Sequence, residues 1–165
     1  MTAIVNKNND GNRESVWDYP RPPRLEKCDK ELEVIFNGIT IAKTRNAFRA
    51  LETSHPPVYY FPPEDVVNKY LRKSNKSSYC EWKGSASFYS IKVNGKLAKD
   101  ALWFYPNPTE RFEPLANYIA FYPDLMDECL VNGEKVKPQR GSFYGGWITE
   151  DLIGPFKGAP GTLFW

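Results

Sequence analysis

Three Asn-Gly dipeptides, each between short apolar segments, constrain most strongly how this chain of 165 residues can fold. Asn and Gly tolerate the positive φ angles that a type I′ turn requires, so Asn-Gly between apolar runs predicts a β-hairpin. The turns are Asn37-Gly38, Asn94-Gly95 and Asn132-Gly133. Their strands are expected at 34–36 and 39–41, at 87–93 and 101–105, and at 130–131 and 135–136. Three hairpins predict a mainly β protein with largely antiparallel sheets.

Helical signals are few. The segment 64–73 follows two prolines and has Val66, Val67, Tyr70 and Leu71 at helical spacing. Its acidic residues come first and its basic residues last, which complements a helix dipole, so we expect a helix there. A second short helix is expected over residues 109–115, with Pro114 near its start or breaking it.

The length indicates one domain with room for a terminal arm. Residues 1–15, rich in Asn and charge, predict a flexible N-terminal arm. Residues 16–136 are expected to form a single domain that begins with a proline strap at 17–26, anchored by Trp17 and Tyr19. The strap could instead be a ligand of a proline-recognition domain. Residues 137–165 mix Gly, Pro and aromatics without a regular period, which predicts an irregular tail packed on the domain.

Charge and cysteine usage narrow the class of protein. The net charge is only +2 and the basic residues are scattered, which predicts neither a nucleic-acid partner nor a membrane patch. Cys28, Cys80 and Cys129 lie about fifty residues apart, too far for a zinc knuckle or a disulfide framework. We therefore expect no metal or other cofactor. With no signal peptide and no apolar run long enough for a membrane span, a cytoplasmic protein is expected.

Motifs for known chemistry are weak. Neither a Walker A loop nor a dinucleotide fingerprint is present. Gly84-Ser85 is not followed by the carboxylate pair with which a nucleotidyl transferase would hold magnesium. His55, the single histidine, is expected to be structural or at the surface, and Cys80 is the only attractive thiol for a nucleophile.

Aromatic and polar residues are densest between positions 42 and 105. On a strand, Cys80, Trp82 and Gly84 would share one face, opposite Glu81 and Lys83. Trp103 and Tyr105 would also share a face. If these faces meet, they enclose an aromatic pocket floored by glycine. The candidate ligand-binding residues are Arg45, Glu52, Tyr60, Trp82, Lys83, Trp103 and Tyr105.

Each of these residues also has a purely structural interpretation. Aromatic pairs across strands stabilise sheets, so the rings could simply form a core. Arg45 and Glu52 are either polar groups at the pocket rim or a structural ion pair. Cys80 is either a small buried side chain or a thiol near Lys83, although their opposite directions on a strand weaken that pairing.

A series of motifs between Leu32 and Tyr122 resembles the bacterial domain of unknown function family 427. The motifs are A-x-T-R, L-E, V-Y-Y-F-P-x-x-D-V, C-x-W-K-G-x-A-x-F-Y, A-x-W-F-Y-P-x-P and I-A-F-Y. The resemblance implies a small antiparallel β-tent domain, a fold shared with methionine sulfoxide reductases of the B type and with ligand-binding tent domains. The strap and the tail are similar to the longer, cyanobacterial version of the family.

The family that this chain resembles carries a nucleotidyl-transferase label in some classifications. The missing carboxylate pair does not support that activity for this chain. The zinc of some tent relatives is not expected, because this chain lacks their Cys-x-x-Cys knuckles. We therefore expect a domain that binds a small organic ligand in an aromatic pocket, oriented by Arg45 and Glu52, without necessarily catalysing a reaction. Two alternatives stay open: a thiol-dependent enzyme that uses Cys80, and a module that binds a partner protein through the strap or tail.

Overall fold

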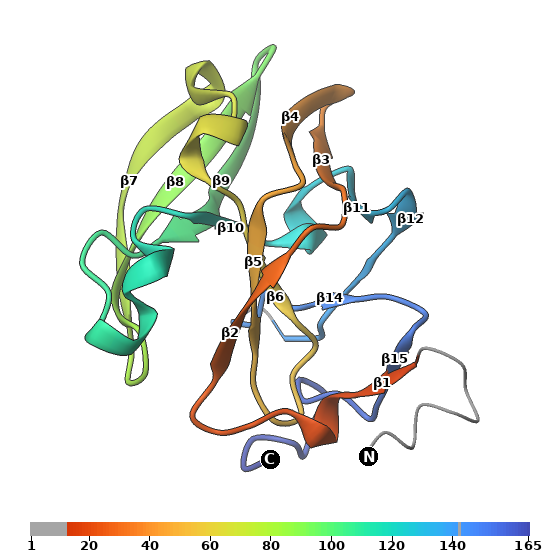
Figure 1. The fold of residues 1–165 in the computed structure, drawn as a ribbon. Helices are drawn as coiled ribbons and strands as arrows, with labels where there is room; N and C mark the ends of the chain where they lie inside the picture. The colour runs from red at the N-terminus through yellow and green to blue at the C-terminus, as the bar shows by residue number, and fades with distance from the viewer. Residues whose placement is uncertain (1–12, 142) are drawn as a thin grey trace.

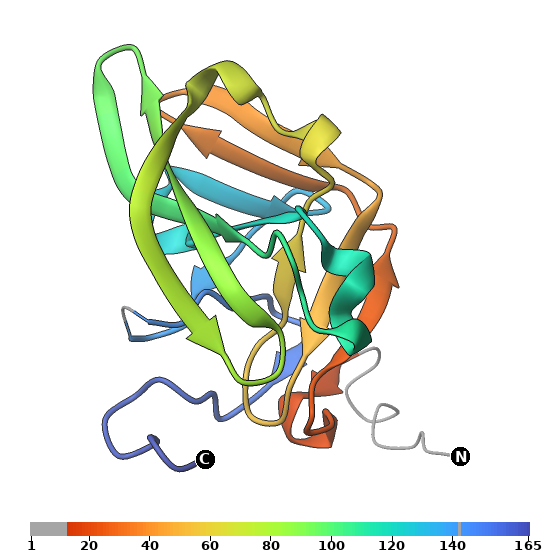
Figure 2. The ribbon, with the colours of Figure 1, turned by 90° about the vertical axis from the view of Figure 1, so that its left-hand side faces the viewer.

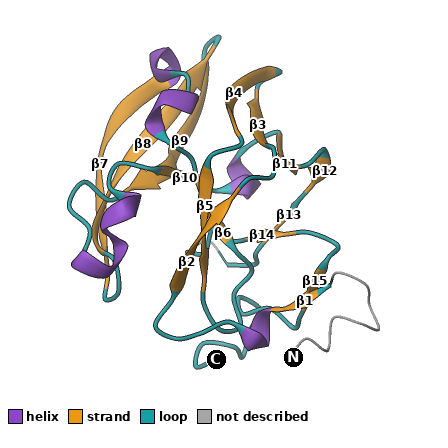
Figure 3. Cartoon of the chain, viewed as in Figure 1, coloured by secondary structure: helices purple, strands orange, loops and turns teal. Residues whose placement is uncertain are grey.

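The computed structural model describes residues 13–141 and 143–165, and it is mainly β, as predicted. Figure 3 shows that strands dominate and that the helical segments are short. One antiparallel sheet has the order β10-β9-β8-β7, in which β7 is Leu71–Cys80, β8 is Gly84–Val93, β9 is Lys96–Phe104 and β10 is Ile119–Phe121. A second has the order β12-β11-β3-β4, with β3 at Leu32–Phe36, β4 at Ile39–Thr44, β11 at Glu128–Val131 and β12 at Glu134–Lys135.

A third sheet joins these two. It contains β2 (Arg24–Cys28), β5 (Ala47–Leu51) and β6 (Val58–Tyr60), and an antiparallel bridge from Phe61 to Ile119 connects the end of β6 with β10. In Figure 1 it lies between β7–β9 on one side and β3, β4, β11 and β12 on the other. The view turned by 90° places β7 and β8 in front of β3 and β11 (Figure 2). The sheets therefore form layers and not a single flat surface.

All three Asn-Gly hairpins are confirmed. The Asn and the Gly both have positive φ in each turn, for example 50° at Asn37 and 77° at Gly38. The turns join β3 to β4, β8 to β9, and β11 to β12. In the second hairpin the return strand begins at Lys96, directly after the turn, which is earlier than predicted.

The helix expected over residues 64–73 is wrong. The chain forms two single 3-10 turns, η3 (Pro63–Asp65) and η4 (Asn68–Tyr70), and then enters β7. Val66 pairs with Ala42 and the Val67 N–H donates to the carbonyl of Ile41, so the edge of β4 takes the backbone that a helix would have needed. Pairing with a neighbouring strand outweighs a local apolar spacing that β-branched valines support only weakly.

Three further 3-10 segments complete the helical content of the described residues: η2 (Val16–Asp18), η5 (Glu110–Leu115) and η6 (Pro123–Leu125). The segment η5 confirms the second short helix, and it contains Pro114 near its end with a kink at Phe112. No helix among the described residues is long and apolar enough to cross a membrane.

Segments near both ends of the described chain form short strands. Residues 1–12 of the expected arm lie outside the described residues, and Glu14–Ser15 already form β1, which pairs in parallel with β15 (Leu152–Ile153). In the tail, β13 (Lys137–Pro138) pairs with β14 (Trp147–Ile148). Trp147 is fully buried, so the predicted tail contributes directly to the interior.

The sheet that contains β8, β9 and β10 separates two hydrophobic clusters, because alternate residues of a strand point to opposite faces. We call them the first core and the second core. The first core includes Leu32, Val34, Phe36, Ile41, Tyr59, Phe61, Ile91, Val93, Leu102, Ile119, Phe121, Cys129 and Trp147. The second core consists of Ala50, Tyr60, Ala86, Phe88, Trp103, Tyr105, Phe112, Leu115 and Ala120.

Candidate functional site

A cavity of about 350 Å³ opens at the edge of the second core. Its walls come from the end of β7, the turn that follows, the strands β6, β8 and β9, and the tail. Most of the sequence-predicted site residues line this one cavity: Glu52, Tyr60, Cys80, Trp82, Lys83, Trp103 and Tyr105.

Arg45 is the exception. Its exposed guanidinium forms an ion pair with Glu31 at 3.7 Å, and it does not line the cavity. Glu52 instead pairs with Arg21 at 3.2 Å. The expected pairing of Arg45 with Glu52 is therefore wrong, because Arg21, which is remote in sequence, takes the carboxylate.

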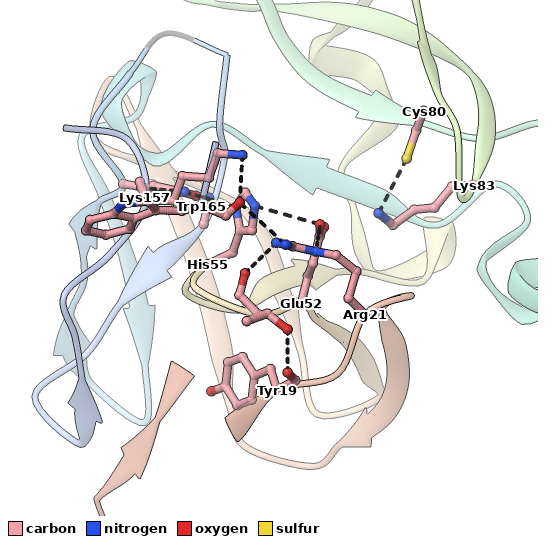
Figure 4. A network of polar contacts seen from close by, with 11 residues as sticks. Tyr19, Arg21, Glu52, His55, Cys80, Lys83, Lys157 and Trp165 are labelled. Carbon is pink, nitrogen blue, oxygen red and sulfur yellow. Dashed lines mark hydrogen bonds and ion pairs between the residues drawn. The ribbon is translucent and has the colours of Figure 1, made fainter. Parts of the chain in front are cut away.

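The Trp82 segment is a turn and not a continuous strand. Residues 81–83 connect β7 to β8, and Gly84 has a φ of 103°. Thr109 fastens this turn, since its hydroxyl donates to the carbonyl of Trp82 at 2.6 Å and its N–H donates to the carbonyl of Lys83 at 3.0 Å. The strand-based expectation that Cys80 and Lys83 point in opposite directions is wrong. The Lys83 ammonium approaches the Cys80 sulfur at 3.9 Å (Figure 4).

Aromatic side chains form the inner wall. Trp103 contacts Tyr122 with ring centres 4.5 Å apart. The ring centre of Tyr60 lies 6.4 Å from those of both Trp103 and Tyr105. Burial raises the pKa of the Tyr60 and Tyr105 hydroxyls, so both phenols stay protonated at neutral pH. Trp82 is only half-buried, at the rim. The rings thus pack as a core on one side and line the cavity on the other.

The cavity also has a polar wall, formed by Glu52 and His55 in the loop that follows β5. The side chain of Gln139 accepts from the Gly146 N–H at 3.1 Å, and its amide nitrogen donates to the Lys157 carbonyl at 2.8 Å. These bonds fix the amide so that it donates to Nδ1 of His55, 3.1 Å away. The proton of the neutral imidazole is then on Nε2, which faces the Glu52 carboxylate at 3.9 Å (Figure 4).

His55 stays neutral in the folded protein. Its pKa is lowered to about 4, first because burial disfavours the charged ring and then because of the positive charges of Lys157, Arg21 and Lys83. At neutral pH the imidazole is therefore a positioned hydrogen-bonding group.

Sequence reasoning missed the part of the cavity wall that comes from the tail. Phe143, Tyr144, Gly145 and Lys157 all line the cavity. A Cβ added at Gly145 would lie 2.3 Å from Cη2 of Trp103, so only glycine allows the tail to approach that ring. The Gly-Gly pair beside aromatic residues was the available signal, but its partner lies more than forty residues earlier in the chain.

Other chemistry-bearing groups lie outside the cavity or are closed off. Cys28 and Cys129 are buried free thiols whose pKa values are raised by burial. Among residues 13–141 and 143–165, no three His, Cys, Asp or Glu side chains are grouped so that they could hold a metal ion.

Comparison with known proteins places the chain in a family. A search of curated proteins finds no match. The family model of domain of unknown function 427 (DUF427) matches residues 24–132, which contain most of the predicted pocket motifs and stop short of the tail that completes the cavity. Since this match spans more than half of the chain, the protein belongs to the DUF427 family.

Proposed function

We propose that this protein binds a small organic ligand with a flat ring in the cavity beside the second core. The observation that carries the proposal is that aromatic side chains from separate segments line one cavity of about 350 Å³. This volume lies near the lower end of the range of about 300–1,000 Å³ that is typical of ligand pockets. Tyr60, Trp103 and Tyr105 are held by their packing, so they offer flat contact area at little further cost in conformational entropy.

The polar wall supports the proposal because it combines donors and acceptors that are already positioned. Gln139 and Glu52 hold His55 from two sides, and Arg21 holds Glu52. Such preorganised groups fix the orientation of a ligand without having to be ordered on binding. We expect this binding to take place in the cytoplasm, where the three free thiols would stay reduced.

A thermal-shift screen with small ring-bearing compounds tests the proposal, because a ligand of the native state raises its melting temperature. We expect Trp82→Ala to reduce the shift produced by any compound found, with little change in the melting temperature of the free protein. Tyr118→Ala is the matched control, since Tyr118 is also partly buried against the second core but does not line the cavity. Equal loss of the ligand-induced shift in both variants would contradict a ligand site at the cavity.

A thiol-dependent reaction is a second candidate, and the contact between Cys80 and Lys83 favours it. Cys80 is partly exposed, lines the cavity and has the Lys83 ammonium 3.9 Å from its sulfur. Reactive cysteines typically lie in partly exposed, electropositive surroundings of this kind. Alkylation by iodoacetamide, followed by mass spectrometry of the folded protein, should then modify Cys80 well before Cys28 and Cys129. Equal protection of all three thiols until the protein unfolds would exclude this candidate.

The interaction-module alternative stays a prediction. Tyr19 is 6% exposed, and the indole N–H of Trp17 donates to the carbonyl of Pro155 at 2.8 Å. Tyr19 is therefore already engaged within the chain, whereas Trp17 is 40% exposed and leaves part of its ring accessible to a partner protein.

A further inference from the structure

Lys83 is a buried cation at the cavity wall that lacks a carboxylate partner. The residue is only 9% exposed, and its side chain lines the cavity. Its ammonium lies 3.9 Å from the Cys80 sulfur and 5.6 Å from the centre of the Phe112 ring. None of the ion pairs among the described residues includes Lys83.

This arrangement leaves most of the interaction capacity of the ammonium unused. A charged group taken out of water is costly unless a strong partner compensates it. A thiol is a weak hydrogen-bond partner, and a ring face attracts a cation less strongly than a carboxylate does. A negatively charged group in the cavity would therefore gain a partner that the chain itself does not provide.

The other charges around the cavity leave this role to a ligand. Glu52 is held by Arg21, and Glu81, the other carboxylate at the cavity, is exposed at the rim. Lys157 adds a second ammonium to the wall and contacts the ring of Tyr144. The lowered pKa of His55 reflects the same accumulation of positive charge, because Lys157, Arg21 and Lys83 all contribute to it.

We propose, on the basis of the ligand site inferred above, that Lys83 binds the carboxylate of a small flat organic acid whose ring lies against the aromatic wall. Lys157, the other ammonium in the wall, already donates to the carbonyl of Trp165 at 3.4 Å, so Lys83 is the ammonium that a ligand can pair with, and its single point charge matches the single charge of a carboxylate. The cavity volume of about 350 Å³ also favours one ring system over a nucleotide.

The test compares an acid with its neutral amide on the unmodified full chain, so that it does not depend on a variant that folds. Isothermal titration calorimetry at pH 7 with 2-naphthoate and 2-naphthamide measures both affinities. We expect 2-naphthoate to bind at least about ten-fold more tightly, which corresponds to one charge-assisted hydrogen bond of about 1.4 kcal/mol. Adenosine and adenosine 5′-monophosphate, measured in parallel, report whether a phosphate is preferred instead.

Lys83→Met should lower the affinity for 2-naphthoate to that for the amide and leave the amide affinity unchanged. Lys92→Met, which removes an exposed lysine from β8, is the matched control and should change neither. If the acid and the amide bind equally, or the preference survives Lys83→Met, the carboxylate inference is wrong while the ligand site itself stands. Tighter binding of the monophosphate than of 2-naphthoate would also overturn it. If neither naphthalene compound binds, this inference fails, and the proposed site fails with it only if the thermal-shift screen also finds no ligand.

Discussion

The two faces of one sheet lead to different kinds of interior. On β9, Leu102 points into the first core and its neighbour Trp103 into the second. The same alternation divides Tyr59 and Phe61 from Tyr60 around the end of β6. The first core is rich in aliphatic side chains, lies between strands of two sheets, and contains the fully buried Trp147. The second core is built mainly from rings, and it remains open at the cavity.

The difference between the two faces accounts for the aromatic residues of the second core. Aliphatic side chains interdigitate and fill a closed layer at high density. Large rings can be supported on one side and present a flat face on the other. Tyr60 and Trp103 do both, since each packs within the second core and lines the cavity. The second core therefore combines packing with the proposed binding site, whereas the first core contributes packing alone.

The largest expected effect belongs to the closed face. Leu102 is fully buried in the first core, so Leu102→Ala should leave an unfilled cavity and lower the free energy of unfolding by about 4 kcal/mol. Urea unfolding followed by circular dichroism measures the change. Trp82→Ala at the cavity rim should cost less, about 1 kcal/mol, because Trp82 is only half-buried and packs against the edge of the second core. Similar losses in the two variants would remove the distinction between a closed and an open face.

The features that the sequence predicts correctly are those decided locally. The Asn-Gly turns depend on two adjacent residues, and the shared face of Trp103 and Tyr105 depends only on the period of a strand. The helix at residues 64–73 failed because Val66 pairs with β4, and the direction of Lys83 failed because Thr109 holds a turn there. These outcomes depend on partners that are distant in sequence and that no local pattern specifies.

Because of the polar wall, the stability of the open face should depend on pH in the acidic range. The stability of the first core should not. Above pH 6.5 His55 is neutral in both the folded and the unfolded chain. As the pH falls from 6.5 toward the folded pKa of about 4, the unfolded chain takes up a proton that the folded protein does not, so stability decreases. The loss should reach about 3 kcal/mol near pH 4. In the first core, Cys129 and Tyr59 have raised pKa values and stay neutral throughout this range.

Measurements of the free energy of unfolding between pH 7 and pH 4 test this prediction in the unmodified protein and in His55→Asn. The amide oxygen of asparagine can accept from Gln139 in place of Nδ1, but it does not titrate. The difference between the two proteins isolates His55 from carboxylates such as Glu14, whose lowered pKa gives a dependence of the same sign. Parallel curves for the two proteins would show that His55 does not stay neutral on folding.

The smallest of the three effects concerns the contact between the tail and the aromatic wall. In Gly145→Ala the new methyl group would overlap Trp103, so the tail or the indole must move, at a cost of about 2 kcal/mol. Trp103→Phe removes the six-membered part of the indole that the methyl group meets. The double variant should therefore be more stable than the sum of the two single changes predicts, with a coupling of about 1 kcal/mol in a double-mutant cycle. Purely additive effects would mean that Gly145 and Trp103 do not contact each other in the cavity wall.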